Sequence, residues 1–472
     1  MSNCARRRIA IIGAGFSGTA TAIQLMRQAA DQTLDVLLIE RGPTFGRGLA
    51  YAENSFPYIL NVPASRMSAF SQHPDDFLMF AQRKNPRIAG EDFLPRSLYG
   101  DYLNDHLETA VAASDGARGS ALLRAGGPRL EKMRGEAIDI QEQSAPAGPT
   151  VILADGRRIL CERVVLASGL QPPRIPDSVR CDIEAPVLRR NPWSAGRLLP
   201  SSSRLLILGS GLTMADVVCE AVARHPDVEI HAISRHGLMP ADQTAFHADS
   251  LRDDALSVNS ARSTRRLVSA IRSLSNDTND RRGDWREVIT LARRLLPQLW
   301  ARLSVVERRR FQRHVQSYWD IHRHRLPGAV HSRLGELRAS GQLTIHAGRI
   351  HSLTSSACGA CAAWVPRGSR DVSTIEAAEV VNCTGPDYDL TRSSDALWRS
   401  LMRRGIAVPD ELRLGVRTSE NGALIERRGN ASDRIFYVGP MLRADYWEAT
   451  AVAELRLHSE RLAGALLKLA FK

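Results

Sequence analysis

Three glycines near the start of the chain have the spacing of a nucleotide-binding turn. Gly13, Gly15 and Gly18 follow the apolar run from Arg8 to Ile12 in the pattern G-x-G-x-x-G. The first glycine makes a tight turn, the second lets backbone approach a pyrophosphate, and the third allows close helix–strand packing. Glu40 ends the next apolar run 22 residues after Gly18, where an acid binds ribose hydroxyls. The pattern predicts a dinucleotide site.

A second glycine turn follows the apolar segment "RLLIL". Gly209 and Gly211 match the first two glycines, but Met214 occupies the third position, which predicts slightly wider helix–strand spacing. The following strand ends in Ser234 and Arg235, with no acid at its tip. A hydroxyl and a guanidinium favour a 2′-phosphate, so this unit is predicted to prefer NADP over NAD, with a solvated Arg235 as the alternative.

Two histidines lie in the basic, aromatic stretch "QSYWDIHRHRLPGAVH" (316–331). With Asp320 as the only acid in that stretch, His322 and His324 make an incomplete ligand set, so no metal site is expected. The stretch either packs as a helix end or forms a lid edge that faces substrate or the NADP phosphates. The candidate lid residues are Trp319, His322, Arg323 and His324.

The one C-x-x-C pair, Cys358 and Cys361, raises a rival hypothesis. A redox dithiol would indicate a disulfide reductase. The pair lies in a Ser-, Gly- and Ala-rich stretch typical of a hairpin between strands, and neither glycine turn is followed by such a pair. We therefore expect a surface hairpin there, and neither a redox dithiol nor a zinc site.

The elements around the motifs predict an α/β protein with two Rossmann-like domains, one inserted into the other. Short strands at 163–169 and 379–386 bracket the second glycine unit, and the segment from Arg434 onward reads as a strand, a loop and a long amphipathic helix that returns to the first domain. We expect a split first domain (1–175 and 379–472), a second domain (195–378) and a helical insertion (250–340).

The insertion is predicted to contain a loop within 277–284 and a helix that begins at Ser304. Glu307 follows three residues later, as in a capping box, and Leu326–Pro327–Gly328 would end the helix. An insertion of this kind in the nucleotide domain could cap the active site.

Composition excludes several classes of function. The chain has 472 residues, 43% hydrophobic and 24% charged, with a net charge of +12. Nearly all of the basic charge is arginine spread along the chain, which argues against nucleic-acid binding and favours anionic small molecules. No apolar run is long enough for a membrane span, and the seven scattered cysteines suit a reducing compartment. We expect a cytoplasmic protein, with homo-oligomerisation left open.

Six segments carry a resemblance to a known family: "IERGPTFGRGLAY", "LNVPASRMSAF", "LPRSLYGDYL", "GSGLTMAD", "YWDIHRHR" and "YWEATAVAELR". The chain resembles the bacterial FAD–NAD(P)-binding protein family, which is similar to the N-hydroxylating and Baeyer–Villiger branches of class B flavin monooxygenases. The resemblance implies FAD in the first domain and NADP in the inserted one. The implied cofactor-binding residues are Gly13, Gly15, Gly18, Glu40, Arg41, Gly46, Arg47, Gly48, Gly209, Gly211, Ser234, Arg235, Gly385, Gly439 and Thr450.

Two departures from the family pattern refine the expected reaction. Pro440 stands where many relatives have an Asp that holds the ribityl chain, so a helix starting near Trp447–Thr450 would have to position the flavin by its dipole. The segment "LRRNPWSAG" lacks the histidines of the Baeyer–Villiger fingerprint, which favours amine hydroxylation over ketone oxidation.

The resulting expectation is an enzyme that uses FAD, NADPH and O2 to N-hydroxylate a small amine or amino acid through a C4a-peroxyflavin. The candidate catalytic residues are Asn61, as a hydrogen-bonding partner of the flavin or nicotinamide, and Arg66, as a clamp for a substrate carboxylate. The alternatives are an FAD dehydrogenase or disulfide reductase that does not use O2, and a non-catalytic nucleotide-binding scaffold.

Overall fold

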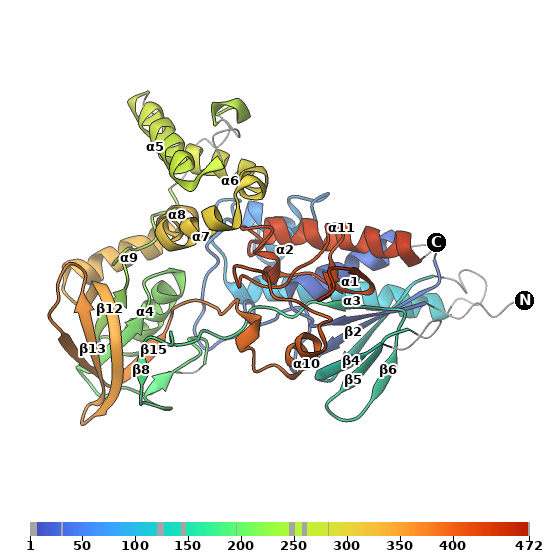
Figure 1. The fold of residues 1–472 in the computed structure, drawn as a ribbon, viewed down its shortest axis with the longest axis horizontal. Coiled ribbons are helices and arrows are strands. Elements are labelled where there is room, and N and C mark those ends of the chain that lie inside the picture. Colours follow the sequence, from blue (N-terminus) through green and yellow to red (C-terminus); the bar gives the residue numbers. More distant parts are fainter. Residues whose placement is uncertain are drawn as a thin grey trace, which may run out of the picture. The chain divides into compact units, whose positions relative to one another are not determined.

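The chain folds into two compact units, which are shown with their element labels in Figure 1. The computed structural model describes residues 7–29, 32–119, 127–142, 148–194, 196–244, 251–256, 262–281 and 283–470. The first unit comprises Met1–Leu170 and Tyr388–Lys472, and the second comprises Gln171–Asp387. Among the described residues, no helix is both long and apolar enough to cross a membrane.

The first unit is built on a six-stranded sheet with the order β16-β17-β7-β1-β2-β3. β1 pairs in parallel with β2 and β7, and its last four residues are fully buried, as expected for a central strand covered on both faces. The strands are β1 (Arg7–Ile12), β2 (Leu34–Glu40), β3 (Arg129–Arg134), β7 (Arg163–Leu166), β16 (Ala423–Ile425) and β17 (Ala431–Tyr437).

Helices and a small second sheet complete the first unit. α1 is rich in small residues, is buried along most of its length and packs against α11. The helices are α1 (Phe16–Gln28), α2 (Asp76–Lys84), α3 (Arg96–Gly119), α10 (Ala396–Arg404) and α11 (Val452–Ala470), with the short 3-10 turns η1 (Ala64–Arg66), η4 (Leu390–Arg392) and η5 (Pro440–Leu442). The small sheet contains β4 (Ala137–Gln141), β5 (Thr150–Leu153) and β6 (Arg158–Leu160).

The second unit has an eight-stranded sheet with the path β14-β13-β12-β11-β10-β15-β9, and β8 pairs with β12. β10 pairs in parallel with β11 and with β15. β13 pairs in antiparallel with both β12 and β14. The strands are β8 (Arg180–Cys181), β9 (Leu188–Arg189), β10 (Arg204–Leu208), β11 (Glu229–Ser234), β12 (Leu343–Ser356), β13 (Gly359–Pro366), β14 (Ser373–Ala377) and β15 (Glu379–Asn382).

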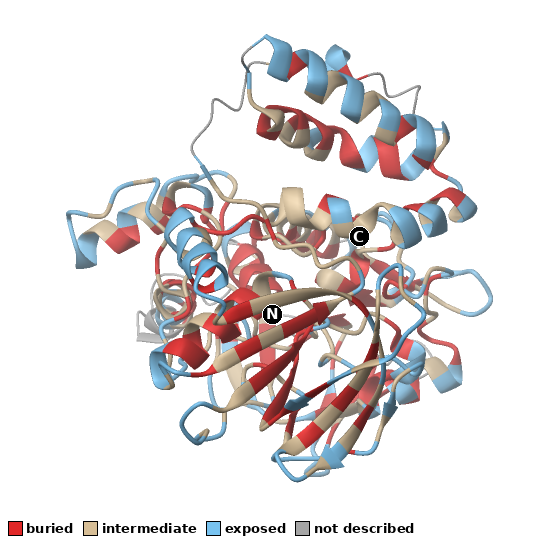
Figure 2. Cartoon of the chain, turned by 90° about the vertical axis from the view of Figure 1, so that its left-hand side faces the viewer, coloured by how far each residue is buried: buried red, intermediate tan, exposed pale blue. Residues whose placement is uncertain are grey.

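The second unit contains the expected helical insertion. The helices of this insertion are buried mainly along one face (Figure 2). α4 (Leu212–Arg224) follows the glycine turn, and α9 (Gly328–Ala339) leads into β12. The insertion contains η2 (Asp253–Ala255), α5 (Thr264–Asp280), α6 (Trp285–Arg302), α7 (Val305–His314) and α8 (Gln316–Arg323).

The predicted α/β class with two dinucleotide-binding units is confirmed, but the return to the first unit lies later than expected. The sequence pattern predicts that residues 379–382 belong to the first domain. They form β15, which is buried at every position and pairs with β10 at Leu205↔Glu379. Because this strand lies inside the second sheet, between β10 and β9, the chain returns to the first unit only after Asp387.

The insertion differs from its prediction in one helix. The Ser304 hydroxyl caps α7 by accepting from the Glu307 amide, as expected. The Glu307 carboxylate does not complete the box, because it accepts from the Thr264 amide at 2.8 Å. The expected single helix is interrupted at Val315 (φ −116°), so it becomes α7 and α8.

Candidate functional site

The first glycine turn can accept only glycine at two positions. Gly13 has φ +106°, and a Cβ there would lie 2.7 Å from the Ala167 carbonyl oxygen. A Cβ on Gly18 would lie 1.8 Å from the Gly13 carbonyl oxygen. Gly15 is the N-cap of α1 and provides no side-chain cap. The turn therefore leaves the N-terminus of α1 accessible to a diphosphate, which fits the predicted FAD.

Glu40 supports this turn directly. One carboxylate oxygen accepts from the Ala14 amide at 2.7 Å, and the other accepts from the Gly42 amide at 2.8 Å. The adjacent Arg41 forms an ion pair with Asp395 at 3.4 Å. Glu40 is thus fixed at the tip of β2 beside the glycine turn, and its contact with a ribose stays a prediction.

The loop at 46–48 also lies against the turn. The Gly46 amide donates to the Ala14 carbonyl at 2.9 Å, and a Cβ on Gly48 (φ +57°) would lie 3.0 Å from the Gly15 Cα. The Arg47 guanidinium does not point to a free anion site, because it pairs with Asp101 and with Glu53 at 3.2 Å. The backbone of this loop lies beside the turn, and a contact of Arg47 with a nucleotide stays a prediction.

The two candidate catalytic residues lie in the first unit, with Asn61 before η1 and Arg66 at its end. Asn61 is half-buried and Arg66 is exposed on η1. Within the described part of the chain, neither side chain has a hydrogen-bond or ion-pair partner. Both are therefore available to a ligand, and their catalytic roles stay predictions.

The end of β17 differs from the expected flavin-positioning helix. Gly439 has φ +142°, and a Cβ there would lie 2.8 Å from the Tyr437 hydroxyl oxygen. Pro440 begins η5, and α11 starts at Val452 instead of within Trp447–Thr450. Thr450 therefore lies in the turn before α11, and the stretch around Pro440 is used for η5.

The second glycine turn has the same construction. Gly209 has φ +105°, and a Cβ there would lie 2.4 Å from the Cys383 carbonyl oxygen. Gly211 caps α4 without a side chain, and nothing lies within 4 Å of its Cβ position. Met214 is fully buried in the core beneath α4. Met214 in place of the third glycine therefore does not cover the N-terminus of α4. This uncapped N-terminus fits the diphosphate of a second nucleotide.

The tip of β11 carries the predicted phosphate-selecting residues. The Ser234 hydroxyl accepts from the Gly237 amide at 3.0 Å and lies 2.8 Å from the Ser210 hydroxyl, so it mainly stabilises the turn. Arg235 is exposed. Two arginines that no motif indicated, Arg349 and Arg367, border the same turn. Their position beside this turn follows from the pairing of β12 with β11 and with β13, and not from a sequence motif. Gly385 (φ +90°) follows β15 and has open space at its Cβ position.

The candidate lid residues make packing contacts. Trp319 is 6% exposed. The Nδ1 atom of His322 lies 2.7 Å from the Tyr318 carbonyl oxygen, and its ring lies edge-on to Trp285 at 5.0 Å. Arg323 and His324 are half-buried. In the part of the chain that the structure describes, no three metal-ligating side chains group together.

The cysteine pair lies on the predicted hairpin, in the second unit. Cys358 is exposed in the turn between β12 and β13, and Cys361 lies on β13 opposite Thr354. Glu376, whose carboxylate is 3.5 Å from the Cys358 sulfur, raises the pKa of that thiol. A raised pKa lowers the thiolate fraction, which is the opposite of what a redox thiol requires.

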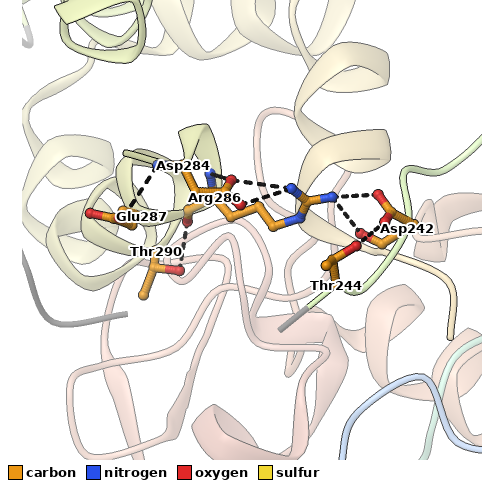
Figure 3. Close-up of polar contacts among 6 residues, drawn as sticks. All are labelled: Asp242, Thr244, Asp284, Arg286, Glu287 and Thr290. Atoms are coloured by element: carbon orange, nitrogen blue, oxygen red, sulfur yellow. Dashed lines mark hydrogen bonds and ion pairs between the residues drawn. The ribbon is translucent and has the colours of Figure 1, made fainter. Parts of the chain in front are cut away.

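A buried arginine ties the insertion to the β11 turn region. The Arg286 guanidinium, 11% exposed, forms ion pairs with Asp284 at the start of α6 and with Asp242 beyond the turn (Figure 3). Asp284 and Glu287 form a complete capping box at α6. The base of the insertion is thereby fixed beside the second glycine unit.

We expect Arg286→Gln to destabilise the second unit by about 2 kcal/mol, because Asp242 and Asp284 lose their shared partner in a partly buried place. The unfolding transition should fall by roughly 4–8 °C in a thermal melt. Arg294→Gln is the matched control on the same helix, because the Arg294–Asp253 pair is exposed on both sides and such pairs contribute less than about 1 kcal/mol. Equal unfolding temperatures of the Arg286→Gln and Arg294→Gln variants would contradict this prediction.

The two nucleotide turns on parallel sheets have the construction of two dinucleotide sites, and the family models that match this chain describe NAD(P)H-dependent flavin enzymes. Residues 10–171 match the model of the FAD-NAD(P)-binding family. Residues 137–281 match the model of L-lysine 6-monooxygenase/L-ornithine 5-monooxygenase. The predicted FAD and NAD(P) cofactors are confirmed at this level.

Individual proteins and one solved structure are also similar to this chain. An uncharacterized protein of Mycobacterium tuberculosis is 24% identical over 97% of this chain and 95% of its own length. The L-ornithine N(5)-monooxygenase of Burkholderia cepacia is 25% identical over 50% of this chain and 54% of its own. The crystal structure of L-lysine 6-monooxygenase from Pseudomonas syringae has a TM-score of 0.62 at 18% identity, covering 98% of this chain and 99% of that one.

Proposed function

We propose that the protein N-hydroxylates the amino group of a small amine or amino acid, with FAD, NADPH and O2. The observation that carries this proposal is the lysine/ornithine monooxygenase match over residues 137–281, a segment that runs from the first unit through the second glycine turn. The helix N-termini at Gly15 and Gly211, which no side chain caps, would hold the two diphosphates that such a reaction needs.

The residues of the chain would bind and orient, while the bound flavin supplies the redox and oxygen-transfer chemistry. The first glycine turn, braced by Glu40, would hold the FAD diphosphate. Arg66 is exposed without a carboxylate partner among the described residues. It would clamp the carboxylate of an amino-acid substrate, and Asn61 would hydrogen-bond an amide edge of the flavin or nicotinamide.

Two rivals are less well supported. A disulfide reductase would use Cys358 and Cys361, but these lie on a β-hairpin of the second unit, and the Cys358 pKa is raised. A non-catalytic scaffold would not need two glycine turns that each leave a helix N-terminus uncapped. An FAD dehydrogenase that does not use O2 is separated from the proposal by the experiment below.

The test measures NADPH oxidation, O2 uptake and hydroxylamine formation by the FAD-loaded protein, with a panel of amines that includes L-lysine and L-ornithine. We expect one NADPH and one O2 consumed per hydroxylamine formed, with the second oxygen atom leaving as water. Cys358→Ser should leave this stoichiometry unchanged. NADPH oxidation without O2 uptake would support a dehydrogenase, and dithiol turnover lost in Cys358→Ser would support a reductase. No NADPH oxidation with any amine would support the scaffold.

A further inference from the structure

Three arginines from three neighbouring strands converge on one turn of the second unit. Ala347 of β12 lies in register with Ser234, the last residue of β11. The Ala347 carbonyl accepts from the Arg367 amide at 2.8 Å, just beyond the end of β13. Arg235 follows Ser234 directly, and Arg349 lies two residues beyond Ala347. The three side chains therefore border the same edge of the sheet, at the carboxyl end of β11.

Within the part of the chain that the structure describes, no ion pair neutralises this positive edge. Arg235, Arg349 and Arg367 are all exposed, and within the described residues none of them forms an ion pair. Burial, together with the positive charges of the three arginines, lowers the pKa of the neighbouring His236. Three unpaired cations close together repel one another, and a dianion between them would relieve that repulsion and form charge-assisted hydrogen bonds.

The insertion contributes an aromatic ring to the same place. Tyr318 of α8 is 39% exposed, and its ring centroid lies 5.5 Å from that of His236. Backbone hydrogen bonds fix α8 there: the Ala241 amide donates to the Ile321 carbonyl at 2.9 Å, and the Gln243 amide donates to the Leu326 carbonyl at 2.7 Å. An aromatic ring beside a cluster of cations is suited to stacking on a purine base.

We propose that Arg349 and Arg367, with Arg235, bind the 2′-phosphate of NADP, and that Tyr318 of the insertion stacks on its adenine. The helical insertion is then part of the nucleotide site, and the β12–β13 hairpin selects NADP over NAD. This inference rests on the proposed function only in that NADPH is the reductant. It identifies Arg349, Arg367 and Tyr318 as specificity residues that the glycine motif does not include.

The test measures binding of adenosine 2′,5′-bisphosphate and adenosine 5′-monophosphate to the full-length protein by calorimetry. We expect the bisphosphate to bind at least about thirtyfold more tightly than the monophosphate. Arg349→Gln and Arg367→Gln should each weaken bisphosphate binding about tenfold without changing monophosphate binding. Tyr318→Leu should weaken both nucleotides by the same factor. Arg370→Gln, which replaces a nearby exposed arginine, is the matched control and should change neither.

Several results would overturn the inference. Wild-type affinity in both arginine variants would exclude the hairpin from the site, and an unchanged Tyr318→Leu would exclude the insertion. Inorganic phosphate that competes as well as the bisphosphate would identify a general anion patch. FAD content, measured in every variant, verifies folding. Nucleotide binding does not depend on amine hydroxylation, so tight bisphosphate binding without hydroxylase activity would refute the proposed function and leave this site standing.

Discussion

Replacing Gly18 with alanine is expected to abolish FAD binding. A Cβ at this position would lie 1.8 Å from the Gly13 carbonyl oxygen and 3.1 Å from the Ala167 Cβ. The obstructing atom is backbone of the glycine turn, so α1 must move away from the sheet or the turn must open. Either change displaces the amides at the N-terminus of α1 that would hold the diphosphate. We expect at least a hundredfold loss of FAD affinity and a destabilisation of about 3 kcal/mol or more.

The measurement is the flavin content of the purified variant, followed by FAD titration. Gly335→Ala is the matched control, because Gly335 also lies inside a helix, α9, and nothing lies within 4 Å of its Cβ position. That change should stabilise the second unit slightly, since alanine favours a helix by up to about 1 kcal/mol. A yellow Gly18→Ala protein with wild-type FAD affinity would show that the first turn is not the flavin site.

The local patterns that predicted the fold correctly are those whose physical cause lies within a few residues. A glycine that needs φ near +105° or has no room for a Cβ, as at Gly13 and Gly209, is recognisable from spacing alone. The return of the C-terminal strand to the first sheet was likewise predictable, because the second half of β17 is apolar and leads through Val438 into Gly439. In the structure this half of β17 pairs with β7.

The errors arise where the deciding contact is distant in sequence. Residues 379–382 read equally well as the end of one domain or the start of another, and only pairing with β10 assigns them to the second sheet. Arg349 and Arg367 carry no motif, and it is the β12–β13 register that brings them to the β11 turn. The partner of Arg47 is equally hidden in the sequence, because Asp101 lies 54 residues further along the chain.

A second large effect is expected from acid, through His458 in α11. This side chain lines a cavity of about 520 Å³ in the first unit, with its ring edge-on to Tyr446 at 4.6 Å. Burial, reinforced by the positive charge of Arg461, lowers the pKa of His458 to about 4. An unfolded chain has a histidine pKa near 6.5, so between these values the unfolded state binds the additional proton. The contribution of the neutral, buried His458 to the free energy of unfolding is complete above about pH 6.5 and is lost as the pH falls towards 4.

The full difference between the folded and unfolded pKa of His458 corresponds to about 3 kcal/mol in the free energy of unfolding. Urea unfolding of the first unit should therefore show a stability that falls from pH 7 to pH 4.5, and His458→Gln should remove most of this slope. His346, whose pKa is also lowered by burial, belongs to the second unit. His73→Gln, at an exposed position of the first unit, is the matched control and should keep the wild-type slope. Because only the folded-state burial of His458 creates the effect, identical slopes in wild type and His458→Gln would mean that its imidazole is hydrated in the folded protein.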